Sequence, residues 1–370
     1  MIAEKSAMID AGGIPMKKII KIILGIVIAI IVVFGGYLIY LFASYDRLPD
    51  NLTLKPHNQH NEVLETNKTY RAMSHNIGYG AYPPSYSFFM DGGKYSRAYD
   101  KKTVEENMQG IVNTTKDVAP TLAFYQEVDQ SGDRSQHVDE VAWLKEHLPA
   151  YNSLYGQNYD SSYLFYPFTD PIGQAKSGLV TLSHAEIASS KRYSLPIETN
   201  FNKFFDLDRA FTVSRIPVKG NHELIAINTH LSAFTKDRSV QAAQLKKIFD
   251  VMETEYQKGN YVMVAGDYNH DVLGNSPEVF NTSKKRETWT HPFPKDQLPA
   301  GFHLPNGNLA EEKIPSARAL NEPYKKGHTY TTLIDGFLLS DNIQVKDLHV
   351  KDMAFQYSDH NPVYLDFSLK

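Results

Sequence analysis

The chain has 370 residues, of which 42% are hydrophobic and 22% are charged, a composition typical of a globular protein and not of a largely disordered one. Its formal net charge of −4 argues against wholesale electrostatic binding of nucleic acid but leaves room for a local basic patch. The chain contains no cysteine, which excludes disulfides, thiolate metal sites and cysteine nucleophiles.

The N-terminal region contains an uncharged apolar run of 21 residues, 22–42. As a helix, this run is long enough to cross a hydrocarbon core of about 30 Å. A cleaved signal peptide is the alternative, but its apolar region usually covers only about 7–15 residues. We therefore predict an uncleaved transmembrane helix over residues 19–43, preceded by a short cytoplasmic N-terminus over 1–18.

The charges beside the apolar run predict its orientation. Lys17, Lys18 and Lys21 precede the run, whereas Asp46 and Asp50 follow it. Positive residues stay on the cytoplasmic side of a membrane. The sequence thus predicts a single-pass protein of the cell membrane in which everything after the apolar run is extracellular.

A polar segment follows, and residues 44–68 are predicted to be a stalk between the membrane and a folded domain. Residues 69–370 alternate strand-like and helix-like pieces and are predicted to form one domain, with apolar residues at helical spacing over 103–118, 137–148 and 240–256. Short apolar runs predict strands at 70–76, 121–127, 177–182, 185–192, 210–218, 224–231, 261–266, 335–339, 343–350 and 363–367.

This balance of elements predicts the architecture of the domain. Many strands with few helices favour two packed sheets with helices outside them. Residues 273–326 show no clear periodicity, so we expect either a long active-site loop or an insertion there.

Polar residues recur where the predicted strands stop. Taken singly, an Asn or Asp in such a place is usually a turn former or a helix cap. As a set, carboxylates, carboxamides and histidines without a thiol form an oxygen-rich site that suits Mg²⁺ or Mn²⁺ better than zinc. The residues are Asn76, Glu127, His230, Asp267, Asn269, Asp335, Asp359 and His360.

The motifs around these residues have a recognisable order. They are Gln126-Glu127, the NTHL run 228–231, the GDYN run 266–269, Ile334-Asp335 and the SDHNP run 358–362. The series resembles the endonuclease/exonuclease/phosphatase superfamily of DNase I-like proteins, as a membrane-anchored, bacterial-type member. The resemblance covers residues 69–370 and implies an α+β fold, a four-layer α/β/β/α sandwich, preceded here by the N-terminal transmembrane helix.

The resemblance also implies metal and water sites. Glu127 would be the principal ligand of Mg²⁺, with Mn²⁺ or Ca²⁺ as alternatives. Asn76 and Asp359 would be further ligands or water-mediated partners. Asp267 and Asn269 would position the nucleophilic water and the scissile phosphate.

Two histidines and one arginine complete the implied site. His360, oriented by Asp335, would polarise the phosphate or transfer a proton. His230 would be a second acid/base or phosphate ligand, which favours the DNase I, sphingomyelinase and phosphatase branches over AP endonucleases. Arg209 would contact phosphate, although an ion pair with Asp206 or Asp208 is an equal alternative.

The predicted activity is that of a metal-dependent phosphoric ester hydrolase, acting as a monomer on a phosphodiester or phosphomonoester. An extracellular nuclease-type phosphodiesterase is the first hypothesis, and a sphingomyelinase- or phosphoinositide-phosphatase-like lipid phosphoesterase is the second. A non-catalytic surface binding module is a third hypothesis from another class. The aromatic segment 79–93 fits base stacking, lipid contact or simple packing, so it does not choose between them.

Overall fold

The computed structural model describes residues 16–233, 238–281 and 290–370 of the chain. Its residues divide into two compact units, one ending at Tyr45 and one running from Asp46 to Lys370. Most of the predicted cytoplasmic N-terminus, residues 1–15, lies outside the described residues.

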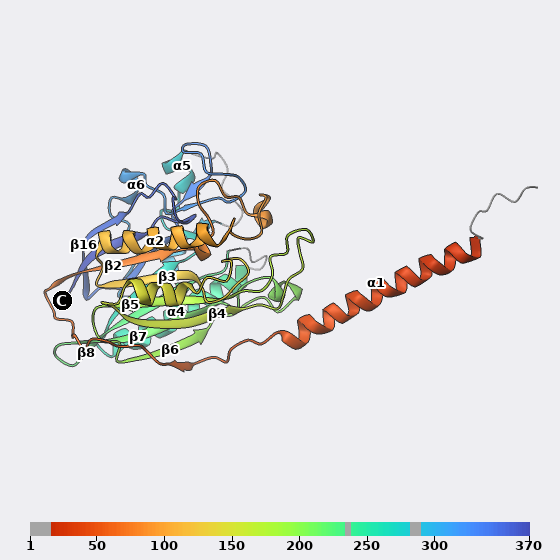
Figure 1. Ribbon diagram of the computed structural model, residues 1–370. Coiled ribbons are helices and arrows are strands. Elements are labelled where there is room, and N and C mark those ends of the chain that lie inside the picture. The colour runs from red at the N-terminus through yellow and green to blue at the C-terminus, as the bar shows by residue number, and fades with distance from the viewer. Residues whose placement is uncertain (1–15, 234–237, 282–289) are drawn as a thin grey trace, which may run out of the picture. The chain divides into compact units, whose positions relative to one another are not determined.

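The first unit is the helix α1, Met16–Ser44 (Figure 1). Its residues from Lys17 to Ser44 have a mean hydropathy of 3.0 in their most apolar stretch. In length and composition the helix can cross a membrane, a property that it shares with signal sequences near an N-terminus. A helix therefore exists where the sequence predicts one, and it ends one residue beyond the predicted boundary.

The second unit contains two large sheets. The first sheet has the strand order β1 (Leu52–Leu54), β6 (Ser189–Ser194), β7 (Ala210–Val218), β8 (His222–His230), β9 (Tyr261–Asp267), β15 (Asp335–Ser340) and β12 (Phe302–His303). The second has the order β16 (Ile343–Val350), β17 (Val363–Leu369), β2 (Thr69–Asn76), β3 (Leu122–Asp129), β5 (Lys176–Ser183) and β4 (Asn152–Asp160). Both sheets contribute buried apolar side chains to one core.

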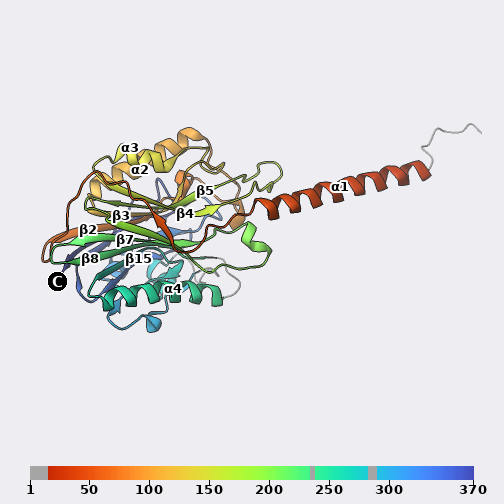
Figure 2. The same ribbon diagram turned by 90° about the horizontal axis from the view of Figure 1, so that it is seen from below.

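Helices cover the outer faces of both sheets. Figure 2 shows α2 (Lys101–Val118) and α3 (Glu140–His147) on one side of the sheets and α4 (Arg238–Gln257) on the other. The α2 helix begins where the Asp100 side chain accepts a hydrogen bond from the backbone N–H of Thr103, the usual N-cap contact. The unit is thus a four-layer α/β/β/α sandwich, which confirms the predicted fold class.

The predicted stalk is mostly part of the folded unit. The β1 strand pairs in antiparallel register with β6 and forms one edge of the first sheet. Just before it, Arg47 donates hydrogen bonds to the carbonyl oxygens of Leu195 and Asp208. The Leu-Thr-Leu run is short and polar on both sides, so the sequence alone did not reveal a strand there. The domain therefore begins at Asp46 rather than at residue 69.

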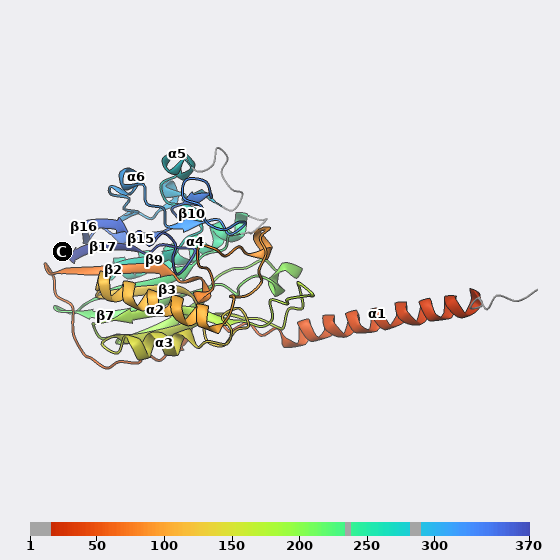
Figure 3. The same ribbon diagram turned by 45° about the horizontal axis from the view of Figure 1, so that its top comes forward.

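The aperiodic segment 273–326 contains only short elements. They are α5 (Ser276–Phe280), β11 (His291–Pro292), the 3₁₀ turn η4 (Lys295–Gln297), β12, α6 (Leu309–Glu312) and β13 (Ala317–Arg318). Figure 3 shows α5 and α6 on the side of the sandwich that also carries β16, and β10 (His270–Asp271) and β14 (Thr331–Thr332) pair with β11 and β13. Residue Ala317 bridges to His360, so the end of this segment belongs to the candidate site.

A close approach of two strands makes Gly266 sensitive to substitution. A Cβ atom at Gly266 would lie 2.0 Å from the carbonyl oxygen of Thr229 on β8, whereas one at its partner Gly336 on β15 would lie 3.7 Å from its nearest neighbour. We expect Gly266→Ala to lower the free energy of unfolding by about 1–3 kcal/mol, the usual cost of overpacking. Urea unfolding of both variants checks this, with Gly336→Ala as the matched control. Equal stability of the two variants would contradict the packing described.

Candidate active site

The predicted site residues gather at one edge of the two sheets, the edge formed by the ends of strands and not by an outermost strand. The parallel strands β2 and β3 both end at this edge, as do the parallel strands β8 and β9. Strand β15 runs antiparallel to β9 and begins there, with Asp335 opposite Asp267. The β17 strand is antiparallel to β2, so the segment before it, which contains His360, reaches the same edge.

Three side chains approach the carboxylate of Asp267, and two of them also lie next to Glu127. The amide nitrogen of Asn76 donates to Oε1 of Glu127 at 3.2 Å and to Oδ2 of Asp267 at 3.1 Å. The Nε2 atom of His230 lies 3.5 Å from Oδ2 of Asp267 and 3.9 Å from Oε1 of Glu127. The Nε2 atom of His360 lies 3.7 Å from the same Asp267 oxygen. These residues come from five separate segments of the chain.

The Asp335–His360 pair is a hydrogen-bonded dyad. The Nδ1 atom of His360 lies 2.8 Å from Oδ2 of Asp335. The hydroxyl of Ser316 donates to the same carboxylate oxygen at 2.7 Å. A carboxylate at Nδ1 fixes the imidazole tautomer and ring orientation, which leaves Nε2 facing Asp267. Ser316 was missed by the sequence analysis, because it lies in the aperiodic segment and carries no motif.

Asn269 and Arg209 converge on one backbone carbonyl. The Asn269 side chain donates to the oxygen of Leu231 at 2.8 Å, and Nη1 of Arg209 donates to the same oxygen at 3.0 Å. Arg209 also forms an ion pair with Asp206 at 2.9 Å, so the alternative partner considered for it is present. Its Nε atom has no hydrogen-bond partner among the described residues. The buried guanidinium thus lies beside the residue that follows His230 and keeps one free donor.

Asp359 packs against the turn that follows Asn76. A Cβ atom at Gly78 would lie 2.7 Å from Oδ1 of Asp359, and Gly78 has a φ of +54°. Only glycine tolerates both the contact and that conformation. The turn η1 (Gly78–Gly80) thus allows the Asp359 carboxylate to approach the side of the site that holds Asn76.

Three non-glycine residues of the site have left-handed backbone conformations. They are Glu127 with φ +54°, Arg209 with φ +44° and Asn269 with φ +49°. Glu127 lies at an irregularity of β3 between Tyr125 and Val128, where the pairing register with β5 shifts. Each such residue costs about 1–3 kcal/mol unless its surroundings impose the conformation. Their clustering here indicates that the surrounding fold imposes backbone conformations that these residues would not adopt on their own.

The two acidic residues nearest the centre are hard to ionise. Burial and the neighbouring charge of Asp359 raise the pKa of Glu127 to about 7, although Arg134 opposes the shift. Burial and the charge of Asp335 raise the pKa of Asp267 to about 7. Carboxylates pressed together without a cation are disfavoured. A bound cation would relieve this repulsion.

The pKa values of the two site histidines, His360 and His230, are shifted in opposite directions. Burial alone would lower the pKa of His360, but the carboxylates of Asp335 and Asp359 outweigh burial and hold that pKa well above its ordinary value. Burial, together with the positive charges of Arg209 and His360, lowers the pKa of His230 well below its ordinary value. Groups whose pKa values are pushed apart in this way are natural acid and base partners.

The donor atoms suit a hard divalent cation. Glu127 and Asp267 offer carboxylate oxygens, and such ligands are preferred by Mg²⁺ and Ca²⁺. Ligand atoms of Asp267, Asp335 and His360 also lie within 4.8 Å of one another. Because Asp335 is engaged by Nδ1 of His360, we assign this trio to the dyad and its neighbour rather than to a metal-binding set. Asn76 turns its amide nitrogen to the carboxylates, while its Oδ1 accepts from the N–H of Gly78.

The aromatic segment after Asn76 is largely packed inside the domain. Tyr79, Tyr82 and Tyr86 are buried, as the packing alternative expected. Arg134 lies over the ring of Tyr79 at 4.5 Å and over the ring of Phe88 at 5.0 Å. It donates to the hydroxyl of Tyr82 at 3.1 Å. No sequence motif singles out Arg134; its one sequence signal is a cation that follows Glu127 by seven residues.

A buried carboxyl behind the site predicts a pH dependence of stability. Glu140 is fully buried and accepts from the N–H of Asp129 at 2.7 Å, while its Oε1 has no partner among the described residues. Burial and the charge of Asp129 raise the pKa of Glu140 well above its ordinary value. A raised carboxyl pKa means that the folded state binds the proton more tightly than the unfolded state. The free energy of unfolding therefore falls as pH rises from the unfolded pKa to the folded one, by at most about 1.4 kcal/mol per pH unit.

Replacing Glu140 with glutamine, a mimic of the protonated acid, should remove this slope. We expect Glu140→Gln to equal the parent domain near pH 4 and to be more stable at pH 8. Thermal unfolding between these pH values measures the difference. Glu146→Gln, at an exposed position of the same helix, is the control and should leave the pH profile unchanged. If the stability of Glu140→Gln changed with pH in the same way as that of the parent domain, this carboxyl would ionise freely in the folded state.

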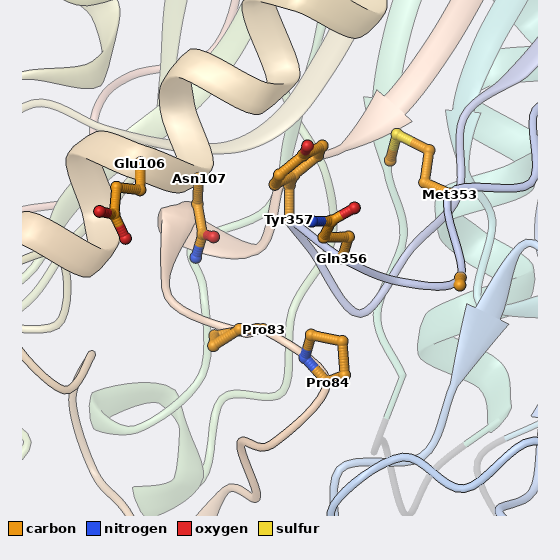
Figure 4. Close-up of a pocket in the computed structure, with 8 residues that line it drawn as sticks. Pro83, Pro84, Glu106, Asn107, Met353, Gln356 and Tyr357 are labelled. Atoms are coloured by element: carbon orange, nitrogen blue, oxygen red, sulfur yellow. The ribbon is translucent and has the colours of Figure 1, made fainter.

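One pocket of the described surface is formed by chain segments that flank the site but is not the site itself. It has a volume of about 570 Å³. Figure 4 shows Glu106 and Asn107 of α2 on one side of it, Gln356 and Tyr357 on the other, and two prolines at the base. None of the site residues lines this pocket. Part of its wall comes from the loop that follows Asn76 and from the loop that precedes Asp359. The pocket is therefore close to the site in the sequence of these two loops.

Comparison with known proteins supports the fold. No family model and no curated protein sequence matches the chain. Among solved structures, an endonuclease/exonuclease/phosphatase from Beutenbergia cavernae DSM 12333 matches with a TM-score of 0.53 and 17% identity, over 82% of this chain and 72% of that one. An endonuclease/exonuclease/phosphatase from Bacteroides vulgatus matches with a TM-score of 0.50 and 13% identity, over 82% and 100%.

A third structure gives the same result. The human Nocturnin catalytic domain with a bound sulfate anion matches with a TM-score of 0.50 and 14% identity, over 82% of this chain and 95% of that domain. At these identities the likeness concerns the fold. Together with the four-layer sandwich, it shows that the chain has the DNase I-like fold of the endonuclease/exonuclease/phosphatase proteins.

Proposed function

We propose that the domain from Asp46 to Lys370 is a divalent-metal-dependent phosphoester hydrolase. The observation that carries this proposal is the meeting of Asn76, Glu127, His230 and Asp267 with the Asp335–His360 dyad at one sheet edge. The fold shared with endonuclease/exonuclease/phosphatase structures supports it. A binding module would have no need for a buried dyad and three strained backbone positions.

The metal belongs to the acidic side of this site. Glu127 would hold Mg²⁺, or Mn²⁺ or Ca²⁺ in its place, with Asn76 and Asp359 beside it. When bound, such an ion neutralises the negative charge that develops on phosphate oxygens. Burial and the charge of Asp359 raise the pKa of Glu127 to about 7, and a cation bound at this carboxylate would favour its ionised form.

The side chains of the domain supply the remaining chemistry. Asp267 accepts the N–H of Asn269 at Oδ1 and directs Oδ2 toward both histidines, so it can orient a water molecule and accept its proton. His360 in its protonated form can stabilise the phosphate oxygens and donate a proton from Nε2. His230 in its neutral form, together with Asn269 and the free Nε of Arg209, can bind the phosphate. These roles are the ones that the sequence predicts.

The same geometry serves two substrate classes. A nucleic-acid phosphodiester, cleaved by an extracellular nuclease-type enzyme, is the first hypothesis from the sequence. A phospholipid headgroup is the second. We further propose that α1 anchors the protein in the cell membrane as a single-pass helix with the domain outside, and that the protein is a monomer.

Hydrolysis assays on the fragment 46–370 test the activity. This fragment is a compact unit with its own core. We expect turnover of bis-p-nitrophenyl phosphate with Mg²⁺ or Mn²⁺ and none with EDTA, and plasmid DNA, RNA and phospholipid vesicles then rank the substrates. Failure to hydrolyse any of these with Mg²⁺, Mn²⁺ or Ca²⁺ would favour the non-catalytic module.

The absence of cysteine makes the topology equally testable. Asn221 lies in an exposed turn between β7 and β8. We expect Asn221→Cys in the full chain to react with a membrane-impermeant maleimide on intact cells and to remain in the membrane fraction. Labelling only after permeabilisation would reverse the proposed orientation, and release of the domain into the medium would indicate a cleaved leader.

A further inference from the structure

Large apolar side chains are exposed on three loops of the domain. We call them the aromatic rim, and they are Met90, Phe165, Tyr166, Phe168, Phe201 and Phe205. Phe168 is 85% exposed, which is unusual for a ring of this size in a domain with a well-filled core. A single exposed apolar residue needs no explanation, but a group of them marks an interaction surface.

The aromatic rim lies at the sheet edge that carries the candidate site. The β5 strand is antiparallel to β3 and begins where β3 ends, so the loop 161–175 before it is at this edge. The β7 strand is antiparallel to β8 and begins opposite its end, so the loop 195–209 is there too. Figures 1 and 2 show both loops, yellow-green and green, at the end toward which β2 points.

The third loop joins this surface by direct contact. It contains Met90 and follows β2, the strand that ends at Asn76. Within it, the ring of Phe89 lies 5.8 Å from the ring of Tyr166, which in turn lies 5.9 Å from the ring of Phe168. The Met90 loop and the loop 161–175 are therefore in direct contact, and the loop 195–209 lies at the same edge, so the three loops form an apolar border on one side of the site.

The charge of the aromatic rim argues against a polyanion as its partner. The loop 161–175 contains one Asp and neither Lys nor Arg, and the segment 195–208 contains three acidic residues and a single Lys. In the third loop, 77–100, Lys94 and Arg97 are balanced by Asp91 and Asp100, so no loop of the rim carries surplus positive charge. Binding of DNA or RNA depends on cationic side chains along the phosphate backbone. Aromatic rings without surplus positive charge are instead typical of the interface between lipid headgroups and acyl chains.

The start of the domain contacts one loop of the aromatic rim. Arg47 donates hydrogen bonds to the carbonyl oxygens of Leu195 and Asp208, which are the two ends of that loop. A membrane anchor on the same chain would raise the effective concentration of the domain at a bilayer surface, so that even weak interfacial affinity of the rim suffices.

We propose that the aromatic rim lies on the lipid bilayer, so that the candidate site opens toward the headgroups and acts on phosphoesters of membrane lipids. This inference rests on the proposed hydrolase activity and on the proposed anchor. It selects the phospholipid headgroup from the two substrate classes. Because the contact is apolar, it does not require anionic lipid and is insensitive to salt.

Vesicle binding by the fragment 46–370 tests the proposal without the helix. Phe168→Trp places a fluorescent reporter in the aromatic rim, and its emission should shift to shorter wavelength with phosphatidylcholine vesicles in both 0.1 M and 0.5 M salt. The double substitution Phe165→Ser with Phe168→Ser should lower the vesicle partition coefficient at least tenfold. Val63→Ser is the matched control, because Val63 is exposed and precedes Leu64, which bridges to Val218 at the opposite end of β7.

Activity assays separate this inference from the hydrolase proposal. The double serine variant should keep its turnover of bis-p-nitrophenyl phosphate within about twofold and lose at least tenfold on vesicle phospholipid. Unchanged vesicle binding, or no shift for the tryptophan reporter, would overturn the lipid surface. A selective loss of single-stranded DNA cleavage would assign the rings to base stacking and overturn it as well. Absence of turnover on every substrate would instead refute the hydrolase, while vesicle binding would still be measured independently.

Discussion

Replacing His360 with alanine is expected to lower the hydrolysis rate of bis-p-nitrophenyl phosphate by roughly 10²–10⁴-fold, the usual loss when a positioned acid or charge stabiliser is removed. The imidazole is held by Asp335 at 2.8 Å and directed at Asp267. The other histidine at that oxygen, His230, has a pKa lowered by burial and by Arg209, so it does not supply the same positive charge. The domain should stay folded, because the deleted ring lies at the sheet edge and not in the apolar core. Steady-state kinetics and thermal unfolding measure the two effects.

Two companion variants show whether the effect belongs to the dyad. Asp335→Asn keeps the size of the side chain but removes the charge at Nδ1, so the rate should fall by a similar order and the alkaline limb of the pH–rate profile should move to lower pH. His349→Ala removes a histidine that pairs with Glu312 and Asp347 on the surface and should leave the rate unchanged. Full activity of His360→Ala would refute the proposed mechanism.

Replacing Glu127 with glutamine is the second substitution with a large expected effect. The variant keeps an oxygen that can accept from Asn76 but loses the negative charge that a divalent ion needs. We expect activity to fall at least 10²-fold and the thermal stabilisation by Mg²⁺ or Mn²⁺ to disappear. The metal-free domain should be at least as stable as the parent, because a desolvated charge beside Asp359 has been removed.

The Glu127→Gln variant should lose stabilisation by metal while the metal-free domain keeps its stability, and this combination makes the experiment decisive. A residue that only supports the fold would lower the melting temperature of the metal-free domain when it is replaced. Asp129→Asn is the matched control, since Asp129 is buried on the same strand but is bonded to Ser135 and to the N–H of Lys176. It should keep the stabilisation by metal. Full metal stabilisation of Glu127→Gln would move the ion to another set of residues.

Periodicity predicted the regular parts of the fold well. The limits of β7 and β16 are the predicted ones, because each is a continuous apolar or alternating run between turn residues. The meeting of Asn76, Glu127, His230, Asp267 and His360 was also predicted, because each follows an apolar run and so could lie at the rim of a sheet. The resemblance supplied the order of the motifs, and the structure supplied the register that brings them together.

The sequence did not predict those parts of the structure that depend on partners far away in the chain. The β4 strand, with the sequence NSLYGQNYD, is polar and glycine-containing, and its pairing with β5 stabilises it more than its own propensity does. The contacts of Ser316 with Asp335 and of Arg134 with Tyr79 join segments with no local pattern. The exposure of Phe168 and Phe201 likewise cannot be inferred from hydrophobicity, which predicts burial for both.

The most direct test of a metal-centred phosphoesterase is a crystal of the fragment 46–370 soaked in Mn²⁺ and measured at the manganese absorption edge. We expect one strong anomalous peak within coordination distance, about 2.0–2.6 Å, of a carboxylate oxygen of Glu127, on the side that faces Asp359 and Asp267. The peak should vanish in Glu127→Gln. A crystal with no peak at Glu127, or with manganese bound only at surface carboxylates, would contradict the central claim.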